Sequence, residues 1–130
     1  MKKMFLLPVL MTVLTACQES LEQRAERTMR DYSEKNCPLK LSETIVMDSC
    51  SFEADTHTLH YFYHFSGALD NDSTLNKEGM RQILVDALKN ETSTRIYKEA
   101  GYNFMYTYFS EKRPDQILFE VTMTQEDYGQ

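Results

Sequence analysis

The chain has 130 residues, with 14 basic and 20 acidic side chains and a formal net charge of −6 at pH 7. This length is typical of one domain and leaves no room for a second hydrophobic core. The acidic balance repels phosphate backbones and no basic patch interrupts it, so the composition argues against a nucleic-acid-binding function.

Residues 1–16 are typical of an export signal. Lys2 and Lys3 supply a short positive segment, and the apolar run that follows them extends to Ala16. This run is much shorter than the ~20 apolar residues of a transmembrane helix. It matches the hydrophobic region of a secretory signal peptide instead.

The signal ends in Leu14-Thr15-Ala16-Cys17, which resembles the lipobox of bacterial lipoproteins. The resemblance implies that residues 1–16 are removed and that Cys17 carries the lipid. The remaining residues 17–130 then form a single small domain of 114 residues with a charge of −8. An acidic domain is repelled by anionic headgroups, so the acyl chains must supply its membrane affinity. We expect a lipid-anchored protein of the cell envelope, in the outer membrane.

Two further cysteines remain in the chain, Cys37 and Cys50. An even number of cysteines in an exported chain indicates one disulfide, which would stabilise the domain by ~3 kcal/mol through the lost entropy of the unfolded chain. The alternative is two unpaired thiols at positions that do not face each other.

The chain beyond the signal predicts alternating helices and β-hairpins. Apolar spacing predicts a helix at 19–35, with Ser20 as a candidate cap and Tyr32 on its apolar stripe. It predicts a second helix from the cap Asn76 to about residue 89, with a further turn at 95–100. Alternating patterns and β-forming residues predict strands at 43–53, 57–66, 102–109 and 117–124, and the polar tail 125–130 is expected to fray.

This order predicts an α+β domain of two layers, helix–hairpin–helix–hairpin. Its four strands should form a mainly antiparallel sheet, with both helices on one face. The second helix has the clearest apolar stripe in the chain, and we expect this stripe to pack on the sheet. Its residues are Met80, Ile83, Leu84, Ala87 and Leu88.

Three histidines, His57, His60 and His64, fall within eight residues. On one strand, His60 and His64 share a face but stand ~13 Å apart, and His57 has the opposite parity. Ligands of one metal ion must lie within ~2.1 Å of it. We therefore predict no metal site and no cofactor, and place these histidines on the wetter face of the strand.

Aromatic residues crowd two of the predicted strands. Core packing under the helices explains most of them. Phe62 and Phe109 have the parity that points away from the helices, which makes them the candidate contacts of a binding face.

The sequence holds none of the common nucleophile, zinc or phosphate-loop motifs. Its composition resembles small exported lipoproteins of Bacteroidetes. We predict a membrane-anchored, non-catalytic interaction or accessory module that binds an envelope protein. The alternative is a binder of a small apolar or glycan ligand through its aromatic cluster.

Overall fold

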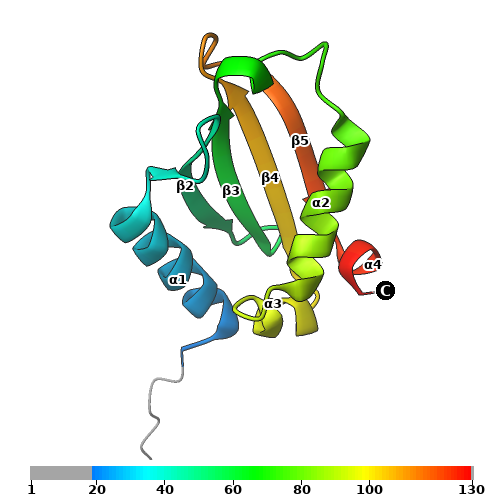
Figure 1. Ribbon diagram of the computed structural model, residues 1–130. Helices are drawn as coiled ribbons and strands as arrows, with labels where there is room; N and C mark the ends of the chain where they lie inside the picture. The colour runs from blue at the N-terminus through cyan, green and yellow to red at the C-terminus, as the bar shows by residue number, and fades with distance from the viewer. Residues whose placement is uncertain (1–18, 130) are drawn as a thin grey trace, which may run out of the picture.

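The computed structural model of the protein describes residues 19–129 (Figure 1). The signal peptide and Cys17 lie outside the described residues. The strands are β1 (Leu39–Lys40), β2 (Ile45–Glu53), β3 (Thr58–Phe65), β4 (Asn103–Ser110) and β5 (Ile117–Met123). The helices are α1 (Leu21–Asn36), α2 (Lys77–Asn90), α3 (Arg95–Glu99) and α4 (Gln125–Tyr128), with one 3-10 turn, η1 (Gly67–Leu69).

The strands form one mixed sheet in the order β1-β2-β3-β4-β5. The pairs β1–β2, β2–β3 and β4–β5 are antiparallel, whereas the central pair β3–β4 is parallel. The expected α+β class and the two hairpins are confirmed. The expected number of four strands is wrong, because the short β1 adds a fifth. The sheet is mainly antiparallel as expected, and the one parallel pair is the junction of the two hairpins.

The parallel junction follows from the chain between the hairpins. The chain leaves the end of β3, returns along the sheet as α2, and enters β4 at the end where β3 begins (Figure 1). A crossover that contains a helix is the usual connection between parallel strands. Each hairpin was predicted correctly. The role of α2 as the crossover between the hairpins was not predicted.

Helix α1 begins with a capping box. The Ser20 hydroxyl accepts the Gln23 amide N–H at 3.1 Å, and the Gln23 side chain accepts the Ser20 N–H at 3.0 Å. Ala25 and Met29 are buried against the sheet, where α1 packs on β2. The expected cap at Ser20 is confirmed, and the helix therefore starts within four residues of Cys17.

Helix α2 is rotated relative to the expected stripe. Val85 and Leu88 are its buried residues, whereas Ile83 is 68% exposed and Ala87 is also exposed. Arg81 contributes to this orientation, since its guanidinium donates to the Asp127 carboxylate at 2.5 Å. The prediction that Ile83 and Ala87 pack on the sheet is therefore wrong, and that for Leu88 is confirmed.

The C-terminal segment forms a helix where a frayed tail was expected. Thr124 and Asp127 cap α4 reciprocally, and Tyr128 is 8% exposed. The Tyr128 hydroxyl donates to the main-chain oxygen of Tyr102 at 2.8 Å. One buried aromatic side chain with a hydrogen-bonded hydroxyl is enough to hold this short polar helix in place. None of the helices within residues 19–129 is both long and apolar enough to cross a bilayer.

The orientation of α2 can be tested by truncating two of its side chains. Leu88→Ala should lower the free energy of unfolding by about 2–5 kcal/mol, because it leaves a cavity in the core. Ile83→Ala removes an exposed side chain and should change it by less than about 0.5 kcal/mol. Urea denaturation measures both values. A larger loss for Ile83→Ala than for Leu88→Ala would contradict this orientation.

Candidate functional site

Helices α1 and α2 stand apart over the sheet (Figure 1). An apolar groove lies between them, above the two central strands. We call it the α1–α2 groove, and its volume is about 470 Å³. Helix α1 packs on β2 and helix α2 lies near β5, so the middle of the sheet forms the floor between them. The lining residues are Thr28, Met29 and Tyr32 of α1, Leu84, Ala87 and Leu88 of α2, Leu59, Tyr61, Tyr63 and Tyr106 of the sheet, and Glu91, Ser93, Thr94 and Tyr97 at one end.

Glu91 is the one charged residue among the described residues that line this groove. The Ser93 amide N–H donates to its carboxylate at 3.1 Å and lowers the pKa of Glu91, so the carboxylate is ionised at neutral pH. The Lys98 ammonium holds the neighbouring chain in place by donating to the main-chain oxygens of Leu88 at 2.6 Å and Glu91 at 2.7 Å. The groove is therefore apolar along its length and negative at one end.

The sequence reasoning missed this groove, although it named several of its residues. Leu84 and Ala87 were assigned to the face of α2 that packs on the sheet, and Tyr32 to the equivalent face of α1. The sequence did hold one signal, because each apolar stripe includes residues that the sheet does not bury. Tyr32 stays 40% exposed as a result. An exposed apolar patch of this kind is informative about binding.

The opposite face of the sheet carries Phe62 and Phe109, as their parity predicted. We call this face, with Glu53, His60, Phe62, His64, Thr107, Phe109 and Glu120, the open face. Both phenylalanines are half-buried. The Phe62 ring stacks on His60 with 3.9 Å between ring centroids, and Phe109 lines a shallow pocket of about 280 Å³ beside His64. Their role as binding residues stays a prediction.

Each of the three histidines contacts a different carboxylate. His57 lies in the turn before β3 and its Nε2 is 2.8 Å from the Glu22 carboxylate of α1. His60 and His64 lie on the open face, and the Nδ1 atom of His64 is 2.7 Å from the Asp48 carboxylate. Within residues 19–129, no three metal-ligating side chains converge on one point.

A chain of hydrogen bonds crosses the open face from β2 to β5. The His60 imidazole lies between the Glu53 carboxylate, at 2.5 Å, and the Thr107 hydroxyl, at 2.7 Å, and that hydroxyl donates to Glu120 at 2.7 Å. The order carboxylate, imidazole, hydroxyl is that of a catalytic triad. Thr107 is only 1% exposed and its proton is already donated to Glu120, so it is not placed to attack a substrate.

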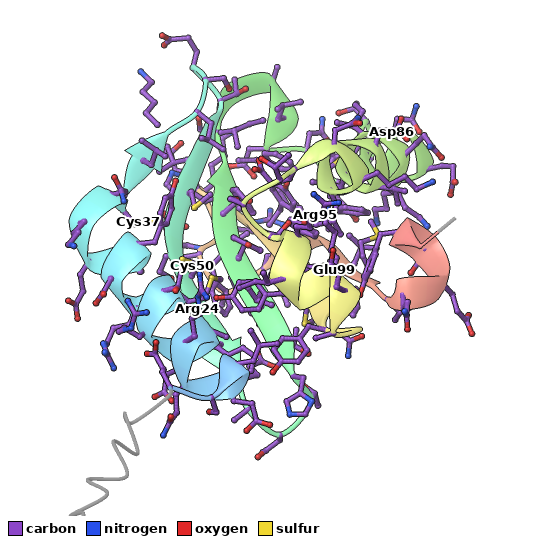
Figure 2. The ribbon with its side chains drawn as sticks, turned by 90° about the horizontal axis from the view of Figure 1, so that it is seen from below. Arg24, Cys37, Cys50, Asp86, Arg95 and Glu99 are labelled. Carbon is purple, nitrogen blue, oxygen red and sulfur yellow. The ribbon has the colours of Figure 1, made fainter. Side chains whose placement is uncertain are left out.

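Cys37 and Cys50 are neighbours at the contact between α1 and β2 (Figure 2). Both have free thiols in the structure, and the Cys50 thiol donates to the main-chain oxygen of Met29 at 3.4 Å. The Ser33 hydroxyl also accepts the Cys50 amide N–H at 3.2 Å. Burial raises the pKa of Cys50 to about 11 and also raises that of Cys37. A disulfide between them stays a prediction, and it would connect the end of α1 to the sheet.

Two known sequence families match the chain. Residues 20–119 match the family described as a domain of unknown function, DUF8479. The chain belongs to this family. Residues 1–18 match the prokaryotic membrane lipoprotein lipid attachment site, which contains Cys17 as its only cysteine. The protein is therefore a lipid-anchored lipoprotein of the cell envelope. No curated protein matches the sequence.

Three solved structures share the fold at low sequence identity. A candidate secreted protein of Pseudomonas aeruginosa superimposes with a TM-score of 0.67 at 15% identity, covering 84% of this chain and 97% of that one. The pilotin EpsS of the Vibrio vulnificus type 2 secretion system has a TM-score of 0.66 at 10% identity. The type II secretion system pilotin AspS of Vibrio cholerae has a TM-score of 0.61 at 13% identity. Each pilotin match covers 82% of this chain and 90% of the pilotin.

The predicted Cys37–Cys50 disulfide can be tested directly. Mass spectrometry of unreduced protein from the envelope should detect the crosslinked peptide pair. Reduction should then lower the free energy of unfolding by about 3 kcal/mol. In the Cys37→Ala variant, which has no disulfide to reduce, reduction should leave the free energy of unfolding unchanged. Complete alkylation of both thiols in denatured, unreduced protein would contradict the disulfide.

Proposed function

We propose that the protein is a non-catalytic accessory lipoprotein of the outer membrane, which binds an apolar helix of an envelope protein in the α1–α2 groove. The observation that carries this proposal is the apolar groove itself, which two helices and the central strands enclose. The likeness of the fold to two secretion-system pilotins supports an accessory role among envelope proteins. The resemblance to Bacteroidetes lipoproteins stays a prediction.

A helix fits the groove because it would complete the helical layer. Neighbouring packed helices stand about 8–10 Å apart, and α1 and α2 leave the two central strands between them without a helix of their own. An amphipathic helix that lies in an apolar groove is a common way to recognise a partner. The negative end of the groove, at Glu91, favours a helix that carries Lys or Arg there.

The lipid anchor keeps the groove close to the membrane. Four residue steps separate Cys17 from Leu21, the first residue of α1, so the lipidated cysteine lies within about 14 Å of that helix end. Glu91 is the C-cap of α2, and this end of α2 lies toward the same end of the molecule as the start of α1 (Figure 1). We therefore expect the bound helix to come from a membrane-proximal segment of the partner.

A small apolar or glycan ligand is the second candidate. The groove volume of about 470 Å³ falls in the range of ~300–1,000 Å³ that small-molecule sites occupy. The tyrosine floor would suit such a ligand as well. A helix and a small molecule are distinguished by the mass of the species that crosslinks to the groove.

We expect a photo-crosslinking amino acid at Ala87 to capture one envelope protein in intact cells. The same amino acid at Gln82, which is exposed on the same helix but does not line the groove, should not capture it. The crosslinked peptide, identified by mass spectrometry, should be apolar and membrane-proximal. A crosslinked lipid or glycan at Ala87 would favour the second candidate, and no crosslink at all would contradict the groove as a binding site.

A pair of charge substitutions provides the matched control. Ala87→Glu places a carboxylate in the groove and should reduce copurification of the captured protein at least tenfold, whereas Gln82→Glu adds the same charge outside it and should not. Both sites are exposed, so stability should change by less than about 0.5 kcal/mol. If Phe62→Ser with Phe109→Ser abolishes copurification and Ala87→Glu does not, the open face is the binding surface.

Lipidation is tested by Cys17→Ala. The variant should keep the unlipidated mass and move from the membrane fraction to the soluble fraction, because the acidic domain has little affinity of its own for anionic lipid. Density-gradient separation of the wild-type membranes should place the protein with the outer membrane. An unchanged mass and distribution of the variant would contradict lipidation at Cys17.

A further inference from the structure

Four tyrosines form two stacked pairs at the base of the α1–α2 groove. Tyr61 of β3 stacks on Tyr106 of β4 with 5.3 Å between ring centroids, and Tyr63 stacks on Tyr108 with 4.5 Å. The parallel register of β3 and β4 places the members of each pair opposite one another. Three of them, Tyr61, Tyr63 and Tyr106, line the groove.

The hydroxyls of Tyr63 and Tyr106 have no hydrogen-bond partner among residues 19–129, although the two residues are only 6% and 8% exposed. The Tyr128 hydroxyl, in contrast, donates to the main-chain oxygen of Tyr102 at 2.8 Å and lies 3.2 Å from that of Lys98. No side-chain nitrogen or oxygen that is sealed from solvent in this part of the chain lacks a partner. The two hydroxyls therefore reach the space of the groove, where an occupant can contact them.

These hydroxyls are neutral donors at physiological pH. Burial, with a smaller contribution from neighbouring tyrosines, raises the pKa of Tyr63 and of Tyr106 above the ordinary value. Phenylalanine would give the same stacking without placing a polar group on an apolar floor. Packing therefore accounts for the rings of these residues but not for their hydroxyls.

We propose that the Tyr63 and Tyr106 hydroxyls select the partner by hydrogen bonding to one Asn or Gln side chain on the apolar face of the bound helix. This inference rests on the proposed function. A helix satisfies its own main-chain groups, so the polar atoms that meet the floor must belong to a side chain. An amide can accept from one hydroxyl and donate to the other. A carboxylate is disfavoured, because Glu91 and the acidic domain repel it.

The inference can be tested with a displayed library of amphipathic helices of about 18 residues, or five turns. The apolar positions are drawn from Leu, Met, Phe, Ala, Asn and Gln, and the polar face is held constant. Selection on the wild-type protein should enrich Asn or Gln at one fixed position in the apolar face. Selection on Tyr63→Phe/Tyr106→Phe should lose that enrichment and favour Leu or Met at the same position.

The other outcomes separate the two proposals. If both proteins select the same purely apolar helices, the hydroxyls have no role in selection and the inference is wrong, while the groove remains a helix site. If no selected helix binds Ala87→Glu more weakly than wild type, the proposed function itself is wrong. Thermal unfolding shows whether the double variant is folded, and the single Phe variants replace it where it is not.

A selected helix then allows a quantitative test. Tyr63→Phe and Tyr106→Phe should each weaken binding of its synthetic peptide by about 3- to 10-fold, as expected for one lost hydrogen bond. With the Asn or Gln of the peptide replaced by Leu or Met, the same variants should bind as wild type does. Equal weakening for both peptides would show that the tyrosines act by packing alone, and would overturn the inference.

Discussion

The arrangement of the molecule depends on the parallel pairing of β3 with β4. Because these strands run in the same direction, α2 must return along the sheet between them, and it does so on the face that α1 already occupies (Figure 1). The same pairing sets Tyr61 beside Tyr106 and Tyr63 beside Tyr108. An antiparallel junction would need no helix at this point of the chain. The parallel pairing of β3 with β4 thus determines both the place of α2 beside the groove and the tyrosine pairs of its floor.

Much of the fold could be predicted from the sequence, because the periodicity of apolar residues indicates local secondary structure. The pattern predicted both hairpins, the N-terminal helix with its cap at Ser20, and the helix that Asn76 begins. It could not give the direction in which the hairpins join, because strand alternation is the same in parallel and antiparallel pairs. It also missed α4, since the burial of Tyr128 depends on main-chain oxygens that lie 26 and 30 residues earlier in the chain.

The candidate site was less accessible to sequence reasoning for a related reason. An apolar stripe shows which residues avoid water but not which surface covers them. Leu84, Ala87 and Tyr32 have the spacing of core residues, yet they line the groove between α1 and α2. The outward parity of Phe62 and Phe109 was read correctly, because parity within one strand needs no tertiary information.

The two faces of the sheet differ in how their polar groups are satisfied, and this difference favours the groove as the site of recognition. On the open face, His60 and Thr107 bond to each other and to the carboxylates of Glu53 and Glu120, so the buried polar atoms there are paired within the chain. In the groove, the Tyr63 and Tyr106 hydroxyls have no hydrogen-bond partner among residues 19–129, and they are open to the groove, where water or an occupant can reach them. The polar groups named on the open face are thus paired within the chain, whereas the proposed helix would give the groove hydroxyls a hydrogen-bond partner.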